Sequence, residues 1–349
     1  MWWLIWMVVQ VFIAVVPVAA ESPSASCTVP PRIAATRPDP QGAITRVLVG
    51  AYVIDIASIN DAAQSFTVDF ILGLRWKDPR LVDKSLGVSV AHCKLGLRDV
   101  WHPAVLFLNH ADLSNQRADT VDIDSQGNVT YAQRFHGNLS APMDLHDFPL
   151  DRQVFPITII SAKYGPEEIV FSVDETITGR ADALSIADWS IGPSVAKAGY
   201  FYFTPQKRLL ARFDYELPAT RHVGFYLRTV IVPLTLFIFM SWAVFWIDPT
   251  LLTTQVSLSA TVMVILVIFQ LKLGTLLPRV PYSTRVDAFV QGSQILVFLA
   301  LVEAVTAGVL AAGGREALAR RLDRWARWAF PAAFAALLII AFWGPHFFF

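Results

Sequence analysis

The chain has 349 residues, no net charge and a mean hydropathy of +0.48, and charged residues make up only 16% of it. This composition is too apolar for an ordinary soluble protein, and the neutral balance gives no electrostatic reason to expect nucleic acid or a strongly acidic partner. The average conceals a division. Residues 30–222 carry most of the charge, whereas the last third consists mainly of long apolar runs.

The first twenty residues (1–20) are almost all apolar and end in small residues, as at the cleavage site of a signal peptide. No Lys or Arg lies near the start, although a secretory signal normally has one, so a further membrane helix is the alternative. Because a polar, proline-rich segment (21–40) follows at once, we expect a signal peptide. The two cysteines, Cys27 and Cys93, could pair in an exported domain, but without a wider framework two free thiols are equally compatible.

Apolar and polar residues alternate from about residue 43 to residue 218, with turn residues every eight to twelve positions. The run from Phe66 to Trp76 predicts a long strand, and Asp124 to Asn128 predicts a hairpin in which Gly127 has a positive φ. Many short strands without an intervening helical pattern favour an all-β, antiparallel, immunoglobulin-like sandwich. We assign this extracellular domain to residues 21–222.

The remainder of the chain (223–349) contains four apolar runs, each near the length of a tilted membrane span. They cover about residues 225–247, 251–273, 288–312 and 330–349. Arginines crowd the expected linker between the third and fourth runs, namely Arg315, Arg320, Arg321, Arg324 and Arg327. The positive-inside rule places that linker in the cytoplasm, which puts the sandwich and the C-terminus on the extracellular or periplasmic side.

The second apolar run carries a stripe of residues at alternating steps of four and three, which places them on one helix face. The stripe consists of Ser257, Thr261, Val264, Ile268, Leu271 and Thr275. Hydroxyl groups can partly replace the water shell of an ion, and an apolar ring can close a narrow pore by dewetting. The alternative is that the Ser and Thr side chains face a neighbouring helix.

Five motifs resemble, in the same order, those of the Cys-loop receptor superfamily of pentameric ligand-gated ion channels. They are Trp76–Leu81, Trp101–Pro103, Asp147–Gln153, Pro233 within the first apolar run, and Leu277–Tyr282. Vertebrate members flank the third motif with a disulfide, whereas the matching positions here are Ala141 and Phe155, as in prokaryotic members. The arginine-rich linker is also short.

The resemblance implies an N-terminal all-β sandwich followed by an all-α bundle of four membrane helices, assembled as a homopentamer in a bacterial inner membrane. It implies a channel for small monovalent ions, with a small-molecule or proton agonist bound between neighbouring sandwiches. The pore would be lined by the second membrane helix, including Thr253 at its cytoplasmic end. No cofactor is implied.

The resemblance also implies an electrostatic cluster that couples agonist binding to pore opening. The matching positions are Asp61, Asp151 and Arg221, with Pro281 and Tyr282 as the receiving residues. A guanidinium that bridges two carboxylates can hold separate loops together. Without the resemblance, Arg221 would be interpreted as a residue that extends to the membrane interface.

The expected agonist site is incomplete, because two of the aromatic positions of the family are Ile71 and Ala162 here. A quaternary ammonium ligand, which needs an aromatic cage, is therefore disfavoured. The remaining ligand-binding candidates are Arg134, for an anionic group, and Tyr164, Tyr202 and Phe203. Trp189 is a further candidate, for which we expect packing, and packing is also the alternative role for the others.

Ion selectivity is weakly specified by the sequence. Cation-selective relatives usually have a Glu where Thr253 occurs here, and Gln255 occupies the basic position of the anion-selective pattern. Asp248 could form an acidic ring at the cytoplasmic mouth, whereas Lys272 would repel cations if it faced the pore. We expect cation conduction.

Glu303 lies within the third run, where an ionisable group is by default a functional hypothesis. It would reach water or an arginine of the linker, so we expect a structural anchor. The seven histidines have no metal-ligand spacing, and no Gly-x-Ser-x-Gly, P-loop or Cys-x-x-Cys occurs, so we expect neither metal nor catalysis. The alternative function is a membrane-anchored sensor or enzyme that does not conduct.

Overall fold

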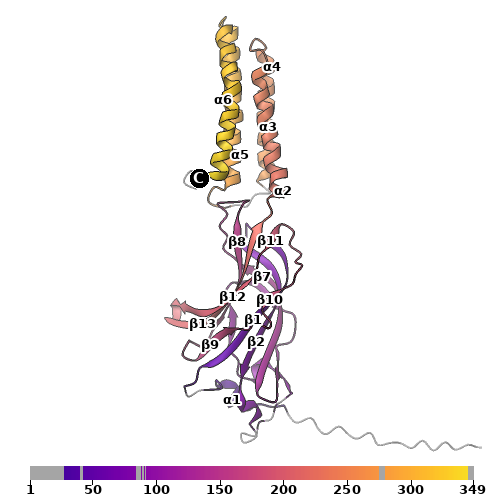
Figure 1. Ribbon diagram of the computed structural model, residues 1–349, viewed down its shortest axis with the longest axis vertical. Helices are drawn as coiled ribbons and strands as arrows, with labels where there is room; N and C mark the ends of the chain where they lie inside the picture. Colours follow the sequence, from indigo (N-terminus) through magenta and orange to yellow (C-terminus); the bar gives the residue numbers. More distant parts are fainter. Residues whose placement is uncertain are drawn as a thin grey trace, which may run out of the picture.

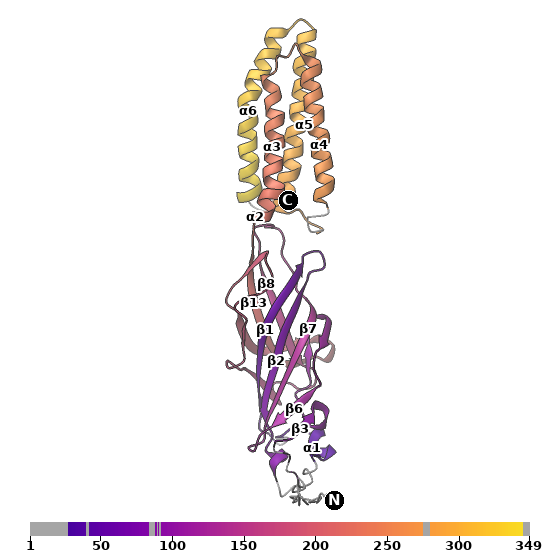
Figure 2. The same cartoon turned by 90° about the vertical axis from the view of Figure 1, so that its right-hand side faces the viewer.

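The computed structural model describes residues 27–39, 42–83, 88, 90, 92–274 and 280–344. A β-sandwich domain and a bundle of long helices lie end to end along the molecule (Figures 1 and 2). The expected signal peptide, Thr275 of the pore stripe and the first half of the Leu277–Tyr282 motif lie outside the described residues.

The larger sheet of the sandwich has the order β10-β1-β2-β7-β6-β3, with β5 paired to β7 and β9 paired to β1. Its strands are β1 (Thr45–Asn60), β2 (Ser65–Lys77), β3 (Lys94–Gly96), β5 (His110–Asn115), β6 (Thr120–Ile123), β7 (Asn128–Ser140), β9 (Ile169–Val173) and β10 (Gly179–Arg180). The long strands pair in antiparallel fashion, as expected. The pairs β1–β9 and β1–β10 are parallel, which the alternation pattern alone did not predict.

The smaller sheet has the order β11-β13-β8-β4, with β12 paired to β13. Its strands are β4 (Val105–Phe107), β8 (Arg152–Ser161), β11 (Trp189–Ile191), β12 (Val195–Phe203) and β13 (Arg208–Arg221). Short helical segments complete the domain, namely α1 (Pro31–Ala35), η1 (Pro79–Val82), η3 (Leu97–Asp99) and η4 (Thr204–Gln206). Alternate side chains of the two sheets form one apolar core, in which Phe66 and Phe155 are in ring contact at 5.2 Å.

The predicted hairpin joins β6 to β7, and its glycine is required by two features of the turn. Gly127 has a φ of +76°, and a Cβ atom there would lie 2.6 Å from the carbonyl oxygen of Asp78. The Asp78 N–H donates to the Gly127 carbonyl at 2.8 Å, so the turn packs against the end of β2. The side chain of Asp124 accepts hydrogen bonds from Gln126 N and Asn128 N at 2.8 and 2.9 Å.

Four helices are long and apolar enough to cross a membrane, spanning Gly224–Trp246, Leu252–Leu273, Arg285–Ala312 and Glu316–Trp343. The first is built from α2 (Gly224–Tyr226), the π-helical turn η5 (Leu227–Ile231), α3 (Val232–Ala243) and η6 (Val244–Trp246); the others are α4, α5 and α6. Pro233 is the second residue after the π-helical turn. Because proline has no N–H and clashes with the preceding turn, a local widening of the helix accommodates it.

The arginine-rich segment was expected to be a linker, and the structure corrects this. Helix α6 (Glu316–Trp343) begins well before the fourth apolar run, so most of these arginines form its first turns. Arginine is a good helix former, and a hydropathy pattern marks only the part of a helix that suits the membrane interior. The two cysteines form a disulfide between Cys27 and Cys93, a choice that the sequence had left open.

Candidate functional site

Arg221, the last residue of β13, bridges two carboxylates from different loops. Its Nε and Nη2 donate to Asp151 at 2.8 and 3.1 Å, and its Nη1 and Nη2 donate to Asp61 at 3.0 and 2.8 Å. Asp61 lies in the turn between β1 and β2, and Asp151 directly precedes β8. The structure therefore brings together the three residues that the sequence analysis placed in one cluster.

This cluster is shielded from solvent by aromatic rings. The Arg221 side chain is 3% exposed, and its guanidinium lies 4.1 Å from the ring of Trp189, 4.8 Å from that of Phe148 and 6.0 Å from that of Tyr226. Burial alone would lower the pKa of Arg221, but hydrogen bonds to Asp151 and Asp61 raise it above its usual value. The charge is therefore permanent, and the two carboxylates compensate it.

The segment that carries Asp151 also contacts the membrane domain. The hydroxyl of Tyr282 accepts a hydrogen bond from Leu145 N at 3.1 Å, and the ring of Tyr282 stacks on that of His146 with centroids 4.0 Å apart. Arg285, at the start of α5 (Arg285–Ala312), donates from Nε to Asp147 at 2.5 Å. One loop thus reaches the Arg221 cluster at one end and the membrane domain at the other.

Only part of this junction was predicted from the sequence. Pro281 was expected beside the cluster, but it is exposed and no contact joins it to Arg221 within the described residues, whereas Tyr282 lies against the loop. Arg285 and His146 were not predicted at this junction, and Trp189 was a ligand-binding candidate for which packing was favoured. No spacing pattern could have found the Asp147–Arg285 pair, because 138 positions separate the two residues.

Helix α4 (Leu252–Leu273) presents the predicted stripe to the outside of the subunit. Thr253, Ser257 and Thr261 are exposed, and the apolar members Val264, Ile268 and Leu271 are 58%, 61% and 74% exposed. The opposite face is buried and consists of Gln255, Ser259, Val262, Leu266 and Leu273. The stripe is therefore not used to pack α4 against the other helices of its own subunit.

Gln255 and Asp248, on which the expected ion selectivity depends, both make hydrogen bonds within the subunit. Gln255 is fully buried, and its Nε2 donates to the carbonyl of Ile247 at 2.9 Å, so it belongs to the interior and not to the stripe. Asp248 accepts hydrogen bonds from Thr250 N and Oγ1 at 3.0 and 2.8 Å, and it lies 3.7 Å from Arg320. Its carboxylate is thus turned toward the first turns of α6.

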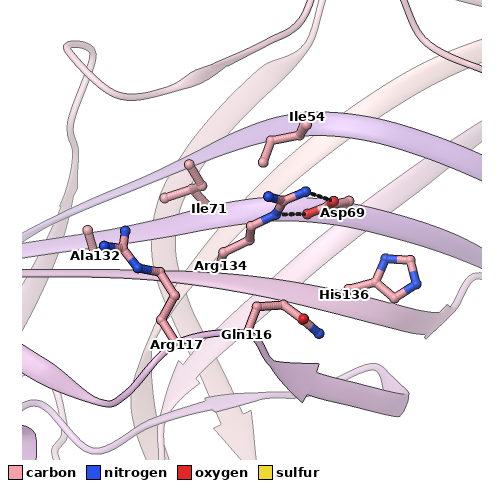
Figure 3. A pocket seen from close by; sticks show the side chains of 8 residues that line it. All are labelled: Ile54, Asp69, Ile71, Gln116, Arg117, Ala132, Arg134 and His136. Atoms are coloured by element: carbon pink, nitrogen blue, oxygen red, sulfur yellow. Dashed lines mark hydrogen bonds and ion pairs between the residues drawn. The ribbon is translucent and has the colours of Figure 1, made fainter.

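A cavity of about 730 Å³ lies on the outer face of the larger sheet (Figure 3). Its lining residues are Ile54, Asp69, Ile71, Gln116, Arg117, Ala132, Arg134 and His136. Arg134 Nε donates to Asp69 Oδ1 at 2.9 Å, and this hydrogen bond raises the pKa of Arg134. The guanidinium groups of Arg117 and Arg134 line the cavity together with the carboxylate of Asp69. The cavity therefore suits an anionic group that competes with Asp69 for Arg134.

The other ligand-binding candidates do not line this cavity. Tyr202 and Phe203 lie on β12, in the smaller sheet, and Tyr202 is 54% exposed. Tyr164 is buried, and its hydroxyl accepts a hydrogen bond from Trp101 Nε1 at 2.8 Å, which favours a packing role. Within one subunit the structure therefore separates Arg134 from the aromatic candidates.

Comparison with known proteins matches both domains. Residues 34–191 match the neurotransmitter-gated ion-channel ligand binding domain, and residues 230–316 match the neurotransmitter-gated ion-channel transmembrane region. The chain is 30% identical over 300 residues to a proton-gated ion channel of Gloeobacter violaceus, and this similarity covers 85% of the chain and 82% of that protein.

Animal receptor subunits are more distant. The chain is 25% identical to the gamma-aminobutyric acid receptor subunit beta-4 of Gallus gallus over 76% of its own length, and 26% identical to the subunit rho-3 of Rattus norvegicus over 77%. These matches span 56% and 59% of the two receptor subunits. The similarity thus includes both domains but not the full length of the animal proteins.

Proposed function

The chain belongs to the neurotransmitter-gated ion-channel family, whose members are pentameric ligand-gated ion channels, and on that premise we propose that it forms a homopentameric cation channel with a pore lined by α4. The observation that carries this proposal is the α4 stripe, from Thr253 to Leu271. It combines hydroxyl groups with exposed apolar side chains and faces away from its own subunit. Five such faces around an axis would give a hydroxyl-lined end and an apolar constriction.

We further propose that the Arg221 cluster transmits agonist binding to the pore. The cluster joins the β1–β2 turn, the loop before β8 and the end of β13, and β13 leads directly into the first membrane helix. The same loop contacts Tyr282 and Arg285 on either side of the start of α5. A displacement of the sandwich would therefore be passed to the helices beside the pore through Asp151 and Asp147.

The agonist is a small anionic molecule or a proton, in this proposal. Arg134 and Arg117 beside the cavity favour a carboxylate, and the similarity to a channel described as proton-gated favours a proton. The aromatic side chains Tyr202 and Phe203 would approach the cavity only from a neighbouring subunit. The ligand site would therefore be completed between subunits.

The proposed setting is a bacterial inner membrane, with the sandwich outside and the arginine-rich start of α6 in the cytoplasm. The prokaryotic subtype is favoured by Ala141 and Phe155, which occupy the positions of the animal signature disulfide and are both fully buried. A membrane-anchored sensor or enzyme without conduction is not favoured, because it gives no reason for the exposed α4 stripe.

Patch recording from liposomes that contain the purified protein tests the proposal. Acidification of the outer solution and a series of small carboxylates are applied in turn. We expect currents that reverse near the cation equilibrium potential. A protein that is inserted and pentameric but silent under every condition, including after polar substitution of Ile268, would contradict the proposed channel function.

A further inference from the structure

Two carboxylates face each other inside the helix bundle. Glu303 lies on α5 and Asp323 on α6 (Glu316–Trp343), and the two side chains are within interaction distance of each other. All four carboxylate oxygens are shielded from solvent and accept no hydrogen bond of normal geometry from the described residues, although the Gln255 amide lies beside Asp323. Asp323 is 1% exposed. Glu303 lies in the second half of α5, whose first residue contacts Asp147, and Asp323 lies near the start of α6, so the pair is in the half of the bundle remote from the sandwich.

A third buried side chain beside this pair also has an oxygen that accepts no hydrogen bond within the described residues. The Gln255 side chain, on α4, lies beside Asp323 and is fully buried. Its Nε2 is committed to the carbonyl of Ile247, and its Oε1 has no donor among the described residues. Five buried acceptor atoms therefore accept no hydrogen bond of normal geometry within the described residues: two of Glu303, two of Asp323 and one of Gln255. Buried polar atoms are nearly always hydrogen-bonded in native proteins, so these carboxylates need a donor that the side chains around them do not supply in good geometry.

Within the described residues no cationic side chain forms an ion pair with these carboxylates, and the charge of Arg327 acts on Asp323 only from a longer distance. Arg327 donates from Nε to the carbonyl of Phe245 at 2.9 Å, and its guanidinium lies 4.5 Å from the ring of Trp246. Arg320 lies 3.7 Å from Asp248 and 3.3 Å from Glu316. The facing segments of α3, η6 and α4 contribute no charged side chain, and Asp248 adds a further negative charge nearby.

The chemistry of the cluster favours a proton over a metal ion. Two ionised carboxylates in a low-dielectric interior repel each other, and each loses its hydration. One proton removes the repulsion and converts a carboxylate oxygen into a donor for the other carboxyl. A second proton would let Asp323 donate to Gln255 Oε1. No group of three or more His, Cys, Asp or Glu side chains gathers anywhere in the described part of the chain, as a metal site would require.

We propose that Glu303 and Asp323 form a proton-binding site that holds α6 against α5. Each subunit retains at least one proton on this pair in the native state. Loss of the last proton leaves two adjacent buried charges, and separation of α6 from α5 is the simplest way to hydrate them. The site would thereby make the attachment of the fourth helix depend on pH, independently of agonist binding at the sandwich.

Infrared difference spectroscopy of the reconstituted channel tests this proposal directly. At neutral pH we expect the carbonyl stretching band of a protonated carboxyl group in the wild type. The band should be lost in both Glu303→Gln and Asp323→Asn, because the new amide donates a hydrogen bond to the remaining carboxylate and allows it to ionise. Glu316→Gln, which changes an exposed carboxylate of the same helix, should leave the band intact. A wild-type spectrum without such a band at neutral pH would overturn the proposal.

Thermal unfolding against pH gives a second measurement. In the unfolded chain both carboxyl groups ionise near pH 4, so above that pH the native state binds more protons and its stability falls as the pH rises. We expect this fall to be reduced in the double variant Glu303→Gln/Asp323→Asn and unchanged in Glu316→Gln. Identical pH profiles for the double variant and the wild type would overturn the proposal. So would a wild-type midpoint that depends on sodium or calcium concentration in place of pH.

Discussion

At the scale of single residues, Arg221 combines two roles that are usually separate. It is an ion-pair partner for two carboxylates and the centre of an aromatic enclosure formed by Trp189, Phe148 and Tyr226. A buried charge is tolerated only when partners compensate it, and here the partners lie on different loops. The position therefore contributes to stability and holds the loops in a defined arrangement.

Replacement of Arg221 by alanine should lower the free energy of unfolding by about 3–5 kcal/mol, because it leaves Asp151 buried without its partner. Agonist-evoked current should disappear, while Arg221→Lys, which keeps the charge but not the bidentate geometry, should retain part of it. Thermal unfolding and concentration–response curves measure the two effects. Normal gating in an assembled Arg221→Ala channel would exclude the coupling role.

A polar substitution in the apolar part of the α4 stripe should open the resting channel. Burial of one isoleucine side chain contributes about 1.5–3 kcal/mol, so we expect Ile268→Ser to raise agonist-independent current roughly tenfold or more. Val264→Ser should act in the same direction. Val267→Ser, one position from Ile268 and outside the stripe, is the matched control for current per channel at equal surface expression.

At the scale of structural elements, the loop before β8 is the connection between the two domains. It reaches the sandwich through Asp151 and the membrane domain through Asp147 and Leu145. Each of these contacts lies within a few residues of the next along the chain, so the loop can move as one unit. The contact between this loop and Tyr282 can be tested by substitutions that remove the hydroxyl and the ring in turn.

Tyr282→Phe removes the hydroxyl that accepts from Leu145 but keeps the ring that stacks on His146. A net hydrogen bond contributes about 1 kcal/mol, so we expect a several-fold rise in the agonist concentration for half-maximal current. Tyr282→Ala removes both contacts and should reduce the maximal current as well. Wild-type responses from both variants would show that neither the ring nor the hydroxyl of Tyr282 transmits the signal.

The segment after β9 is anchored to the larger sheet by Asp174. This carboxylate accepts hydrogen bonds from Arg75 Nε at 2.7 Å and from Thr176 N and Oγ1 at 3.1 and 2.7 Å. Burial alone would raise the pKa of Asp174, but the hydrogen bonds from Thr176 and Arg75 lower it below its usual value. The folded protein therefore binds fewer protons here than the unfolded chain does.

The stabilisation by Asp174 should accordingly be complete above about pH 4 and be lost as the pH falls toward the lowered pKa. We expect Asp174→Asn to lower the melting temperature at neutral pH and to flatten the acid side of the pH profile. Asp182→Asn, at an exposed position of the following segment, is the control. An unchanged acid limb in Asp174→Asn would contradict the anchoring role.

At the scale of the whole molecule, the proposed pentamer gives the exposed surfaces of the subunit a use. The α4 stripe would meet its copies around the axis, and the cavity beside Arg134 would meet the β12 aromatic side chains of a neighbour. Two exposed tryptophans of α6, Trp328 near its middle and Trp343 at its end, remain for contact with lipid. The three surfaces are different faces of one elongated subunit.

Ion selectivity is a property of the assembled pentamer and has to be measured on the open channel. In asymmetric salt we expect the reversal potential to follow the cation gradient, since Asp248 places a carboxylate near the start of α4 in every subunit. Asp248→Asn should reduce cation current without altering assembly. A reversal potential that follows chloride would contradict the cation assignment while leaving the channel function intact.

Sequence alone determined the properties that depend on local pattern. The alternation of apolar and polar residues between turn residues predicted the sandwich, and the length of the apolar runs predicted the four membrane helices. The spacing of the stripe residues predicted that they share one face of α4. These are short-range features, because the side-chain period of a strand or helix is set by the backbone itself. The hairpin at Gly127 was confirmed for the same reason.

Tertiary structure decided everything that depends on residues distant in the chain. The parallel pairings of β1, the Cys27–Cys93 disulfide and the Asp147–Arg285 pair join positions that no spacing rule relates. Glu303 was recognised as unusual but was assigned to water or an arginine, whereas its partner is Asp323 on the next helix. The rotation of two packed helices brings these carboxylates together, and it is set by the fit of side chains along the whole helix interface and not by either sequence segment alone.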